Sequence, residues 1–403
     1  MKIYENYPDG KMLWFNDFYN DGDSIFFSAG NFNGLYKYSL KGNGLQRLGE
    51  FKDEFFLEKQ LYGSAFRFEN QLIFVPLSAY SIGIFNLENE SFESVPLPVP
   101  KAEGGIECKF LNSVLYNNSI FAFPGYATYI IEYDINNKKI IVHDEWYGEF
   151  INRWEKRSNL LFHFDMVQIN DMVYIPSAQY NGWFQYCLSK NTYMFMEVLS
   201  INERINTLCY DGKYLWSTTE KKVIILNLDG TIVDQIDICA VYGVKGSFYH
   251  SVFDNGYLWL FFSQSSEALK IACSHYKEKF EIVQYCALEK RYTNYEYHAI
   301  DFIKKKKDGY CFLCRGNRIL YKIVGGDAVK WLDAIEDTTD YSEQAIADVN
   351  ILMEAMRYQD RTDAFLHRRN NKNSLGIAGD NFLVERENNN AEDIGTKIFK
   401  EML

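Results

Sequence analysis

The chain has 403 residues and a mass of 47.2 kDa, enough for two or three ordinary domains or for one large repeating domain. Aromatic residues make up 17% of it and only 7 residues are Pro. This composition excludes a disordered or low-complexity chain, which lacks the apolar material to offset the entropy of ordering. A formal net charge of −12 argues against duplex nucleic acid or an anionic membrane as the main partner. Because Tyr and Phe favour half-buried pleated surfaces, the composition predicts β-structure.

Three features of the sequence indicate the cellular compartment in which the protein is expected. The first eight residues have no apolar core of the kind found in secretory signals, and no run of residues is apolar for long enough to predict a transmembrane helix. The 8 Cys show no short disulfide-scaffold spacing in this long chain. We therefore expect a soluble, cytoplasmic protein whose thiols are reduced.

A turn residue followed by an apolar strand recurs seven times along the chain. It occurs at residues 22–27, 70–76, 118–124, 170–176, 212–217, 256–261 and 309–314. The turns are 42 to 53 residues apart, which is close to the length of one four-stranded propeller blade. Each unit continues with a loop, a third apolar strand, a second turn and a more polar fourth strand.

These units resemble those of the kelch-like and related β-propeller superfamily. The resemblance lies in Asn-x-apolar-aromatic-x-x-Pro, as at 118–124, followed by apolar-x-x-Tyr-Asp, as at 130–134. The Gly-Gly pair typical of kelch repeats is missing, with Pro124-Gly125 nearest to it, and the Trp-Asp and Gly-His signatures of WD40 blades are missing too. The resemblance therefore implies a fold and no particular activity.

The predicted fold is all-β, a seven-bladed β-propeller of four-stranded blades over residues 1–335. Two β-sandwiches would also give short strands at regular spacing, but seven repeats of a four-strand unit favour the propeller. One aromatic residue per unit is predicted to fill the layers between blades. These residues are Phe26, Phe74, Phe121, Tyr174, Trp216, Trp259 and Phe312.

A helical C-terminal extension is predicted over residues 336–403. Asp340 and Glu343 have capping-box spacing, and apolar residues then recur at three and four residues, which predicts a helix over 341–358. A polar loop over 360–388 and a second helix over 391–402 follow. Both helices could pack against the propeller, or the last one could dock into a groove of a partner protein.

The propeller resemblance also places a candidate site. It implies that the inner strands begin at one rim of the central channel, on the face that carries the loops between second and third strands; we call this end the ring face. Counting back from each turn gives one polar residue per unit. The predicted ring consists of Asn16, Ser64, Asn112, His163, Asn206, His250 and His298. Such groups suit hydrogen bonding to a polar ligand, and they would equally hydrate a channel mouth.

The loops on the same face add aromatic and polar side chains. Those predicted to lie between second and third strands are Asn31, Phe32, Tyr80, Tyr126, Tyr129, Tyr180, Trp183 and Arg315. Aromatic rings beside amides are typical of sugar and peptide recognition, although a chain so rich in aromatics has some of them by composition alone. The sequence predicts a non-catalytic binding or scaffold protein that recognises a protein, peptide or glycan partner on the ring face, without a cofactor.

The alternative is a metal-dependent lyase or hydrolase acting on a polar carbohydrate. His163, His250 and His298 could hold a divalent metal ion with open positions for substrate. Some seven-bladed propeller lyases that act on uronic-acid sugars have such a histidine-bound metal, so the fold allows this chemistry. The ring, however, contains no carboxylate to complete an ordinary acid–base set.

Two further motifs receive structural interpretations. Cys311 and Cys314 have the spacing of a redox or zinc pair, but residues three apart in a strand point to opposite faces, so we expect two buried thiols. The four lysines of 304–307 are interpreted as a solvated run at a strand turn on the face opposite the ring. We find no nucleophile elbow, phosphate-binding glycine loop or His-Glu-x-x-His motif in the sequence.

Overall fold

The computed structural model describes residues 12–42, 44–54, 59–98, 109–154, 160–200, 202–244, 246–263, 265–285, 299–315 and 317–339. The chain divides into two units, Met1–Ser342 and Glu343–Leu403. The predicted C-terminal helices lie outside the described residues and stay predictions. In the part of the chain that is described, no helix has the length and apolarity needed to cross a membrane.

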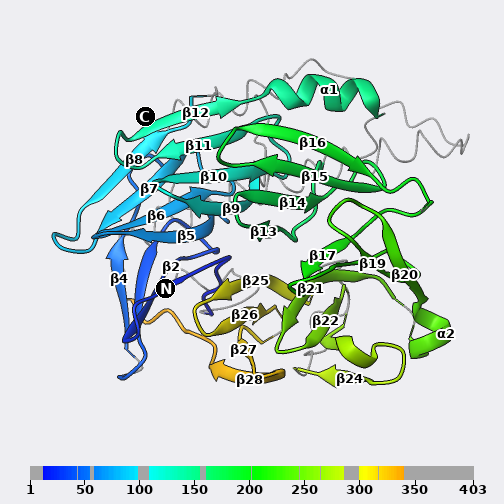
Figure 1. The fold of residues 1–403 in the computed structure, drawn as a ribbon. Helices are drawn as coiled ribbons and strands as arrows, with labels where there is room; N and C mark the ends of the chain where they lie inside the picture. The colour runs from blue at the N-terminus through cyan, green and yellow to red at the C-terminus, as the bar shows by residue number, and fades with distance from the viewer. Residues whose placement is uncertain are drawn as a thin grey trace, which may run out of the picture. The chain divides into compact units, whose positions relative to one another are not determined.

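Seven sheets of four strands, each built from consecutive strands in antiparallel order, form a ring (Figure 1). This is the predicted seven-bladed β-propeller. The first three blades consist of β1 (Tyr19–Asn20), β2 (Ser24–Ser28), β3 (Leu35–Ser39) and β4 (Leu45–Gly49); β5 (Tyr62–Phe68), β6 (Gln71–Pro76), β7 (Ser81–Asn86) and β8 (Phe92–Pro96); and β9 (Phe110–Tyr116), β10 (Ser119–Pro124), β11 (Ile130–Asp134) and β12 (Lys139–His143).

The remaining four blades follow in the same order. They consist of β13 (Val167–Ile169), β14 (Met172–Pro176), β15 (Gly182–Cys187) and β16 (Thr192–Glu197); β17 (Thr207–Tyr210), β18 (Leu215–Thr218), β19 (Lys222–Leu226) and β20 (Ile232–Asp237); β21 (Phe248–Asp254), β22 (Tyr257–Phe262), β23 (Glu267–Ala272) and β24 (Phe280–Gln284); and β25 (Ile300–Lys306), β26 (Gly309–Cys314), β27 (Leu320–Val324) and β28 (Asp327–Leu332). A short 3-10 helix, η1 (Cys273–His275), links β23 to β24.

The recurring turns have a stereochemical basis. Asn117, Asn170 and Asn255 have φ values of 53°, 56° and 46° between the first and second strands of their blades. A tight hairpin turn requires positive φ, and Asn tolerates this conformation better than most residues because its short side chain bonds the nearby backbone. The Asn-and-Gly signal in the sequence therefore marks the hairpin of each blade.

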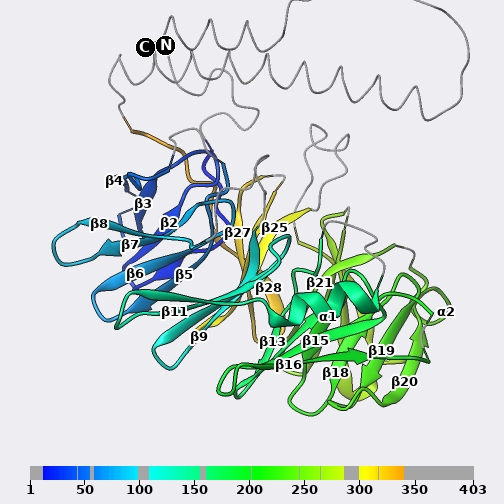
Figure 2. The ribbon, with the colours of Figure 1, turned by 90° about the horizontal axis from the view of Figure 1, so that it is seen from above.

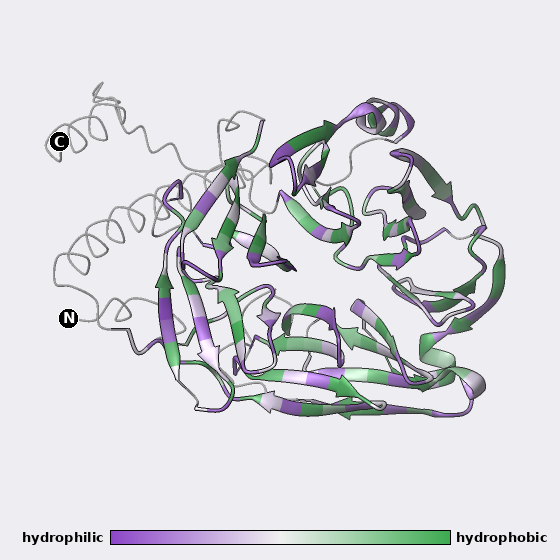
Figure 3. Cartoon of the chain, turned by 60° about the vertical axis from the view of Figure 1, so that its left-hand side comes forward, coloured by the Kyte–Doolittle hydropathy of each residue, from purple (hydrophilic) through white to green (hydrophobic). Residues whose placement is uncertain are grey.

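The aromatic residues predicted to fill the layers between blades are all buried. Phe121 of the third blade, for example, lies with its ring 6.2 Å from that of Tyr186 in the fourth. Apolar and polar segments alternate along the strands (Figure 3), and the fourth strand of a blade is the more exposed one, as in β8 and β24. Most of the aromatic excess is therefore structural, because each blade buries both of its faces against its neighbours.

The ring is closed by the segment after β28. Met12 and Glu336 form an isolated antiparallel bridge, and the Leu13 N–H donates to the Ile335 carbonyl at 2.8 Å. The end of the seventh blade is thus hydrogen-bonded to the chain that leads into the first. A closed ring leaves no open blade at which another sheet could add.

The interpretation of 304–307 as a solvated run is wrong for two of its lysines. Lys306 Nζ lies 2.5 Å from Asp17 Oδ1 in the first blade, and Lys304 Nζ lies 3.4 Å from Ser64 Oγ in the second. Both lysines belong to the inner strand β25, in which alternate side chains point to the same side. The strand β25 includes Lys304, Lys305 and Lys306, so Lys306 contacts the adjacent first blade and Lys304 lines the central channel.

The thiol expectation also needs a correction. Cys311 is a buried free thiol, as expected, but Cys314 is disulfide-bonded. Sequence spacing alone cannot detect such a bond, because pairing depends on which cysteines the fold brings together in space.

Two helices in the connections between blades were not expected: α1 (Glu145–Arg153) between the third and fourth blades, and α2 (Ile238–Tyr242) between the fifth and sixth. Helix α1 lies against β15 and β16 (Figures 1 and 2), with Trp146 and Phe150 buried. The four-residue spacing of Trp146, Phe150 and Trp154 is the helical signal that could have revealed it.

Candidate functional site

The inner strands converge on a central channel that contains a cavity of about 50 Å³. Its walls come from six blades and include two of the predicted ring residues, Asn16 and His250. The cavity is lined by Asn16, Gly63, Leu77, Leu111, Phe164, His250, Asp301, Phe302, Ile303 and Lys304. Since a water molecule occupies roughly 30 Å³ in the liquid, this space suits water or a small ion and is too small for a carbohydrate or peptide side chain.

Several predicted ring residues are used to join adjacent blades. Asn16 Nδ2 donates to the Tyr62 carbonyl at 3.2 Å, and Asn112 Nδ2 donates to the His163 carbonyl at 3.0 Å. Ser64 Oγ accepts the long contact from Lys304 described above. Asn16 also lines the channel cavity, and each of the three side chains has a bonding partner within the protein itself.

A buried carboxylate that the sequence analysis missed organises the fourth to sixth blades. Asp165 Oδ1 lies 2.9 Å from His250 Nδ1, while Oδ2 accepts from the Ser251 N–H and hydroxyl, both at 2.8 Å, and from the Leu208 N–H at 3.2 Å. Groups of the fifth and sixth blades therefore converge on this one carboxylate of the fourth. The sequence does contain a signal for this carboxylate, because Asp165 follows the predicted ring residue His163 by two positions.

His163 is one of several buried polar side chains with an atom that lacks a partner among the described residues. Its Nε2 is buried and has no hydrogen-bond partner within the described part of the chain. Burial lowers the pKa of His163 to about 4, against the opposing attraction of Asp165, so the imidazole is neutral at pH 7. Burial also lowers the pKa of the Lys304 ammonium, with Asp17 acting in the opposite direction.

The predicted three-histidine metal site stays a prediction. His298 lies outside the described residues, and the described ones contain no group of three or more His, Cys, Asp or Glu side chains placed to hold a metal ion. His250 is held by Asp165 and His163 has a free Nε2, a chemistry that suits a metal ligand. The enzyme alternative that depends on this set therefore also stays a prediction.

The other predicted site residues have separate surroundings. Asn206 uses its backbone N–H to bond the Thr218 carbonyl at 2.7 Å. Tyr80 is half-buried with Lys109 Nζ 3.9 Å above its ring. Arg315 Nε lies 2.5 Å from the buried carboxylate of Asp301.

The remaining loop residues divide into exposed and buried ones. Tyr126 is 36% exposed, whereas Asn31 and Phe32 are buried and Tyr129 is half-buried. Trp183 lies inside strand β15 and is fully buried, so the expectation that it projects from a loop is wrong. The strand begins one residue earlier, at Gly182, which turns the indole into the core.

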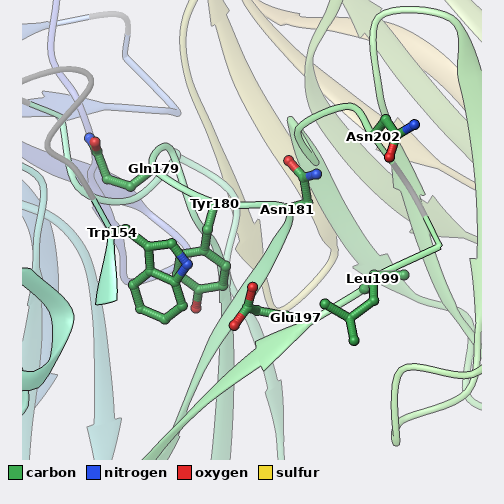
Figure 4. A pocket seen from close by; sticks show the side chains of 8 residues that line it. Trp154, Gln179, Tyr180, Asn181, Glu197, Leu199 and Asn202 are labelled. Carbon is green, nitrogen blue, oxygen red and sulfur yellow. The ribbon is translucent and has the colours of Figure 1, made fainter. Parts of the chain in front are cut away.

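A larger cavity of about 290 Å³ lies beside the fourth blade (Figure 4). We call it the blade-four cavity. It is formed by the residue after α1, the loop between β14 and β15, and the end of β16 with the segment that follows. Its lining residues are Trp154, Gln179, Tyr180, Asn181, Glu197, Val198, Leu199 and Asn202. Of these residues, only Tyr180 was predicted from the sequence.

Its floor is a rigid aromatic stack. The rings of Trp154 and Tyr180 are 4.1 Å apart and inclined by 14°, and Phe150 of α1 supports Trp154 with ring centroids 5.5 Å apart. Tyr180 is buried, and its hydroxyl has no hydrogen-bond partner among the residues that the structure describes. Burial, with a contribution from Glu197, raises the pKa of Tyr180 well above its usual value, so it stays a neutral phenol.

The rim of this cavity is exposed and mixed in character. Leu199 is 85% exposed and provides an apolar side chain at the edge of the cavity. Glu197 ends β16 and is also exposed, with no hydrogen-bond or ion-pair partner in the described residues. The blade-four cavity thus combines an aromatic floor, an available carboxylate and an apolar edge.

No protein-family model and no curated protein sequence matches the chain. Solved structures match by shape. YCF48 bound to D1 peptide is 10% identical with a TM-score of 0.53, over 81% of this chain and 94% of that one. The extracellular domain of a hybrid two-component system of B. thetaiotaomicron is 14% identical with a TM-score of 0.49, over 82% of this chain. PorZ of Porphyromonas gingivalis is 11% identical with a TM-score of 0.49, over 83% of it.

The chain spans 39% of the length of the two-component domain and 40% of that of PorZ. These identities are low, so the likeness bears on the fold alone. The kelch-like subfamily suggested by the blade pattern stays a prediction. Shape, strand order and repeat together show that the chain forms a seven-bladed β-propeller.

Proposed function

We propose that the protein is a non-catalytic binding protein that holds a peptide segment of a partner protein in the blade-four cavity on its ring face. The observation that carries this proposal is the cavity itself, which combines a stacked Trp154 and Tyr180 with an 85% exposed Leu199. Aromatic anchors beside an exposed aliphatic residue are typical of protein recognition surfaces.

The central channel is a poorer candidate for the ligand site than the blade-four cavity. Its cavity is about 50 Å³, and Asn16, Asn112 and His250 are already bonded to neighbouring blades. Binding a ligand there would first require breaking bonds that hold the ring together. The proposed ligand site is therefore a loop cavity at one blade, away from the polar ring predicted from the sequence.

The aromatic stack favours a peptide over a glycan. A sugar ring packs on the open flat face of an aromatic side chain. Here one face of Trp154 is covered by Tyr180, and the guanidinium of Arg153 lies 5.8 Å from the ring. Tyr180 is itself buried. The fold does accommodate such ligands elsewhere, since YCF48 was solved with a peptide bound.

The test is affinity capture from the source organism with three forms of the full chain. Leu199→Asp adds a charge at the cavity rim, and Met194→Asp adds the same charge at another exposed apolar residue, in β16, where Met194 is 54% exposed. We expect wild type and Met194→Asp to retain one partner protein and Leu199→Asp to lose it at least tenfold, as measured by quantitative mass spectrometry. Equal capture by all three forms, or release by a soluble glycan and not by partner peptides, would contradict the proposal.

A further inference from the structure

We infer that the blade-four cavity takes a basic side chain, Lys or Arg, of the partner peptide, next to an apolar residue that contacts Leu199. This inference rests on the proposed function and specifies the chemistry of its ligand. It depends on three properties of the cavity: an available carboxylate, a buried hydroxyl without a partner, and a volume suited to a side chain.

The carboxylate is that of Glu197. Two basic residues near the cavity, within the described part of the chain, have other partners: Arg153 pairs with Glu149 within α1, and Arg204 Nη1 donates to the Ala178 carbonyl at 3.2 Å. Glu197 has no such partner in the described residues. An incoming ammonium or guanidinium would gain a charge-assisted hydrogen bond, about twice as strong as a neutral one.

The hydroxyl is that of Tyr180, which lies next to Glu197 in the cavity (Figure 4). The side chain is 3% exposed and its oxygen has no partner among the described residues. Leaving such a group unpaired costs free energy, and a ligand N–H would supply the missing hydrogen bond. Lysine and arginine side chains carry several N–H donors and no acceptor, so one group could bond both Tyr180 and Glu197.

The volume and the rim define the rest of the ligand. A cavity of about 290 Å³ lies at the lower limit of small-molecule sites, which span roughly 300–1,000 Å³. It therefore holds a single long side chain with its backbone outside. The exposed Leu199 then meets the adjacent residue of the peptide, and an apolar neighbour there would bury both side chains.

The experiment uses a phage-displayed library of random heptapeptides, selected on the full chain. The variants are Glu197→Gln, Glu197→Lys and the control Glu220→Gln, an exposed carboxylate in the loop between β18 and β19 of the fifth blade. We expect wild type and Glu220→Gln to enrich Lys or Arg beside an apolar residue. A synthetic peptide of the enriched sequence should bind Glu197→Gln about tenfold more weakly, and Glu197→Lys should enrich acidic residues instead.

Two outcomes would overturn the inference, and they have different meanings. If wild type enriches peptides that Leu199→Asp no longer binds, but these peptides lack basic residues or bind Glu197→Gln equally well, the inference fails and the proposed function stands. If no peptide enriched on wild type depends on Leu199, the proposed function fails with it. Thermal unfolding of each variant shows whether a loss of binding reflects a loss of fold.

Discussion

At the scale of single residues, the channel wall contains groups whose ionisation is set by burial. His163 is the clearest example, because its Nε2 has lost water without gaining a partner among the described residues. A neutral imidazole tolerates this environment, whereas an imidazolium would be a buried and poorly compensated charge. The protonation of one side chain is therefore coupled to the stability of the whole ring.

The first prediction is an acid-dependent loss of stability that originates at His163. Its folded pKa of about 4 lies below the unfolded value of 6.5, so the folded state binds fewer protons between these two values. The stability contribution is complete above pH 6.5 and is lost as the pH falls from 6.5 to about 4, by about 3 kcal/mol in total. Urea unfolding at pH 7.0, 5.5 and 4.5 measures it.

The matched comparison is between two histidines. His163→Gln replaces the buried imidazole with a side chain that does not titrate. The free energy of unfolding of this variant should therefore fall less steeply with decreasing pH than that of wild type. His275→Gln changes an exposed histidine in η1 and should keep the wild-type slope. If the free energy of unfolding falls equally steeply with decreasing pH in wild type and in His163→Gln, a group other than His163 causes the loss of stability.

At the scale of elements, α1 links the core of the third and fourth blades to the blade-four cavity. Phe150 packs against Phe162 and Phe195, with ring centroids 5.9 and 5.7 Å apart, and it also supports Trp154. The aromatic floor of the cavity therefore rests on a helix that is anchored in the core. A ligand site built on such an element is held more precisely than one on a free loop.

The next prediction concerns this anchoring. Phe150→Ala should destabilise the protein by roughly 3–5 kcal/mol, because it leaves a cavity among rings that cannot fully collapse. Ile151→Ala, one residue further on the same helix and 48% exposed, should change stability by less than about 0.5 kcal/mol. Chemical denaturation of both variants tests this, and equal losses would mean that α1 is not anchored through Phe150.

The elements also show what could be predicted from the sequence. The blades were predictable because each hairpin turn has a local requirement, such as positive φ at Asn117, and because strand alternation is local too. Helix α1 was missed because its three aromatic residues lie in a connection between blades. The solvated position predicted for Lys306 is wrong because four consecutive lysines are typical of a turn, whereas the chain there continues as strand β25.

The candidate site was less predictable because it depends on packing between blades. Counting back along the chain found Asn16 and Asn112, but their bonds to neighbouring backbone depend on how blades are placed, which no single repeat encodes. The blade-four cavity combines three segments that are far apart in the sequence. Tyr180 was found through its loop, whereas Glu197 and Leu199 follow an outer strand and gave no signal of their own.

At the scale of the whole molecule, the ring is closed by polar contacts as well as by the Met12–Glu336 bridge. The ion pair between Lys306 and Asp17 connects the last blade to the first, and Lys306 Nζ also donates to the Phe18 carbonyl at 2.6 Å. The Asp17 side chain is 7% exposed. Lys306 therefore compensates this buried carboxylate together with the Phe18 and Ala65 N–H groups, which donate to its two oxygens.

The last prediction tests this closure. Lys306→Met leaves the Asp17 carboxylate buried without its counter-charge and should cost about 3 kcal/mol. Lys307→Met removes an exposed lysine of the same run and should cost little. Thermal and urea unfolding of both variants give the comparison, and a Lys306→Met protein as stable as Lys307→Met would mean that the ion pair does not contribute to closure.

Asp165 has a consequence for how the polypeptide reaches its native state. The side chain belongs to the fourth blade, yet its oxygens bond groups as far along the chain as Ser251, 86 residues later. During synthesis the fourth blade therefore has a carboxylate that cannot gain its bonds to His250 and Ser251 until the sixth blade has left the ribosome. A nascent chain that stops short of β21 should keep its fourth blade open to chaperones and proteases, so the middle of the ring is completed as one cooperative unit of three blades.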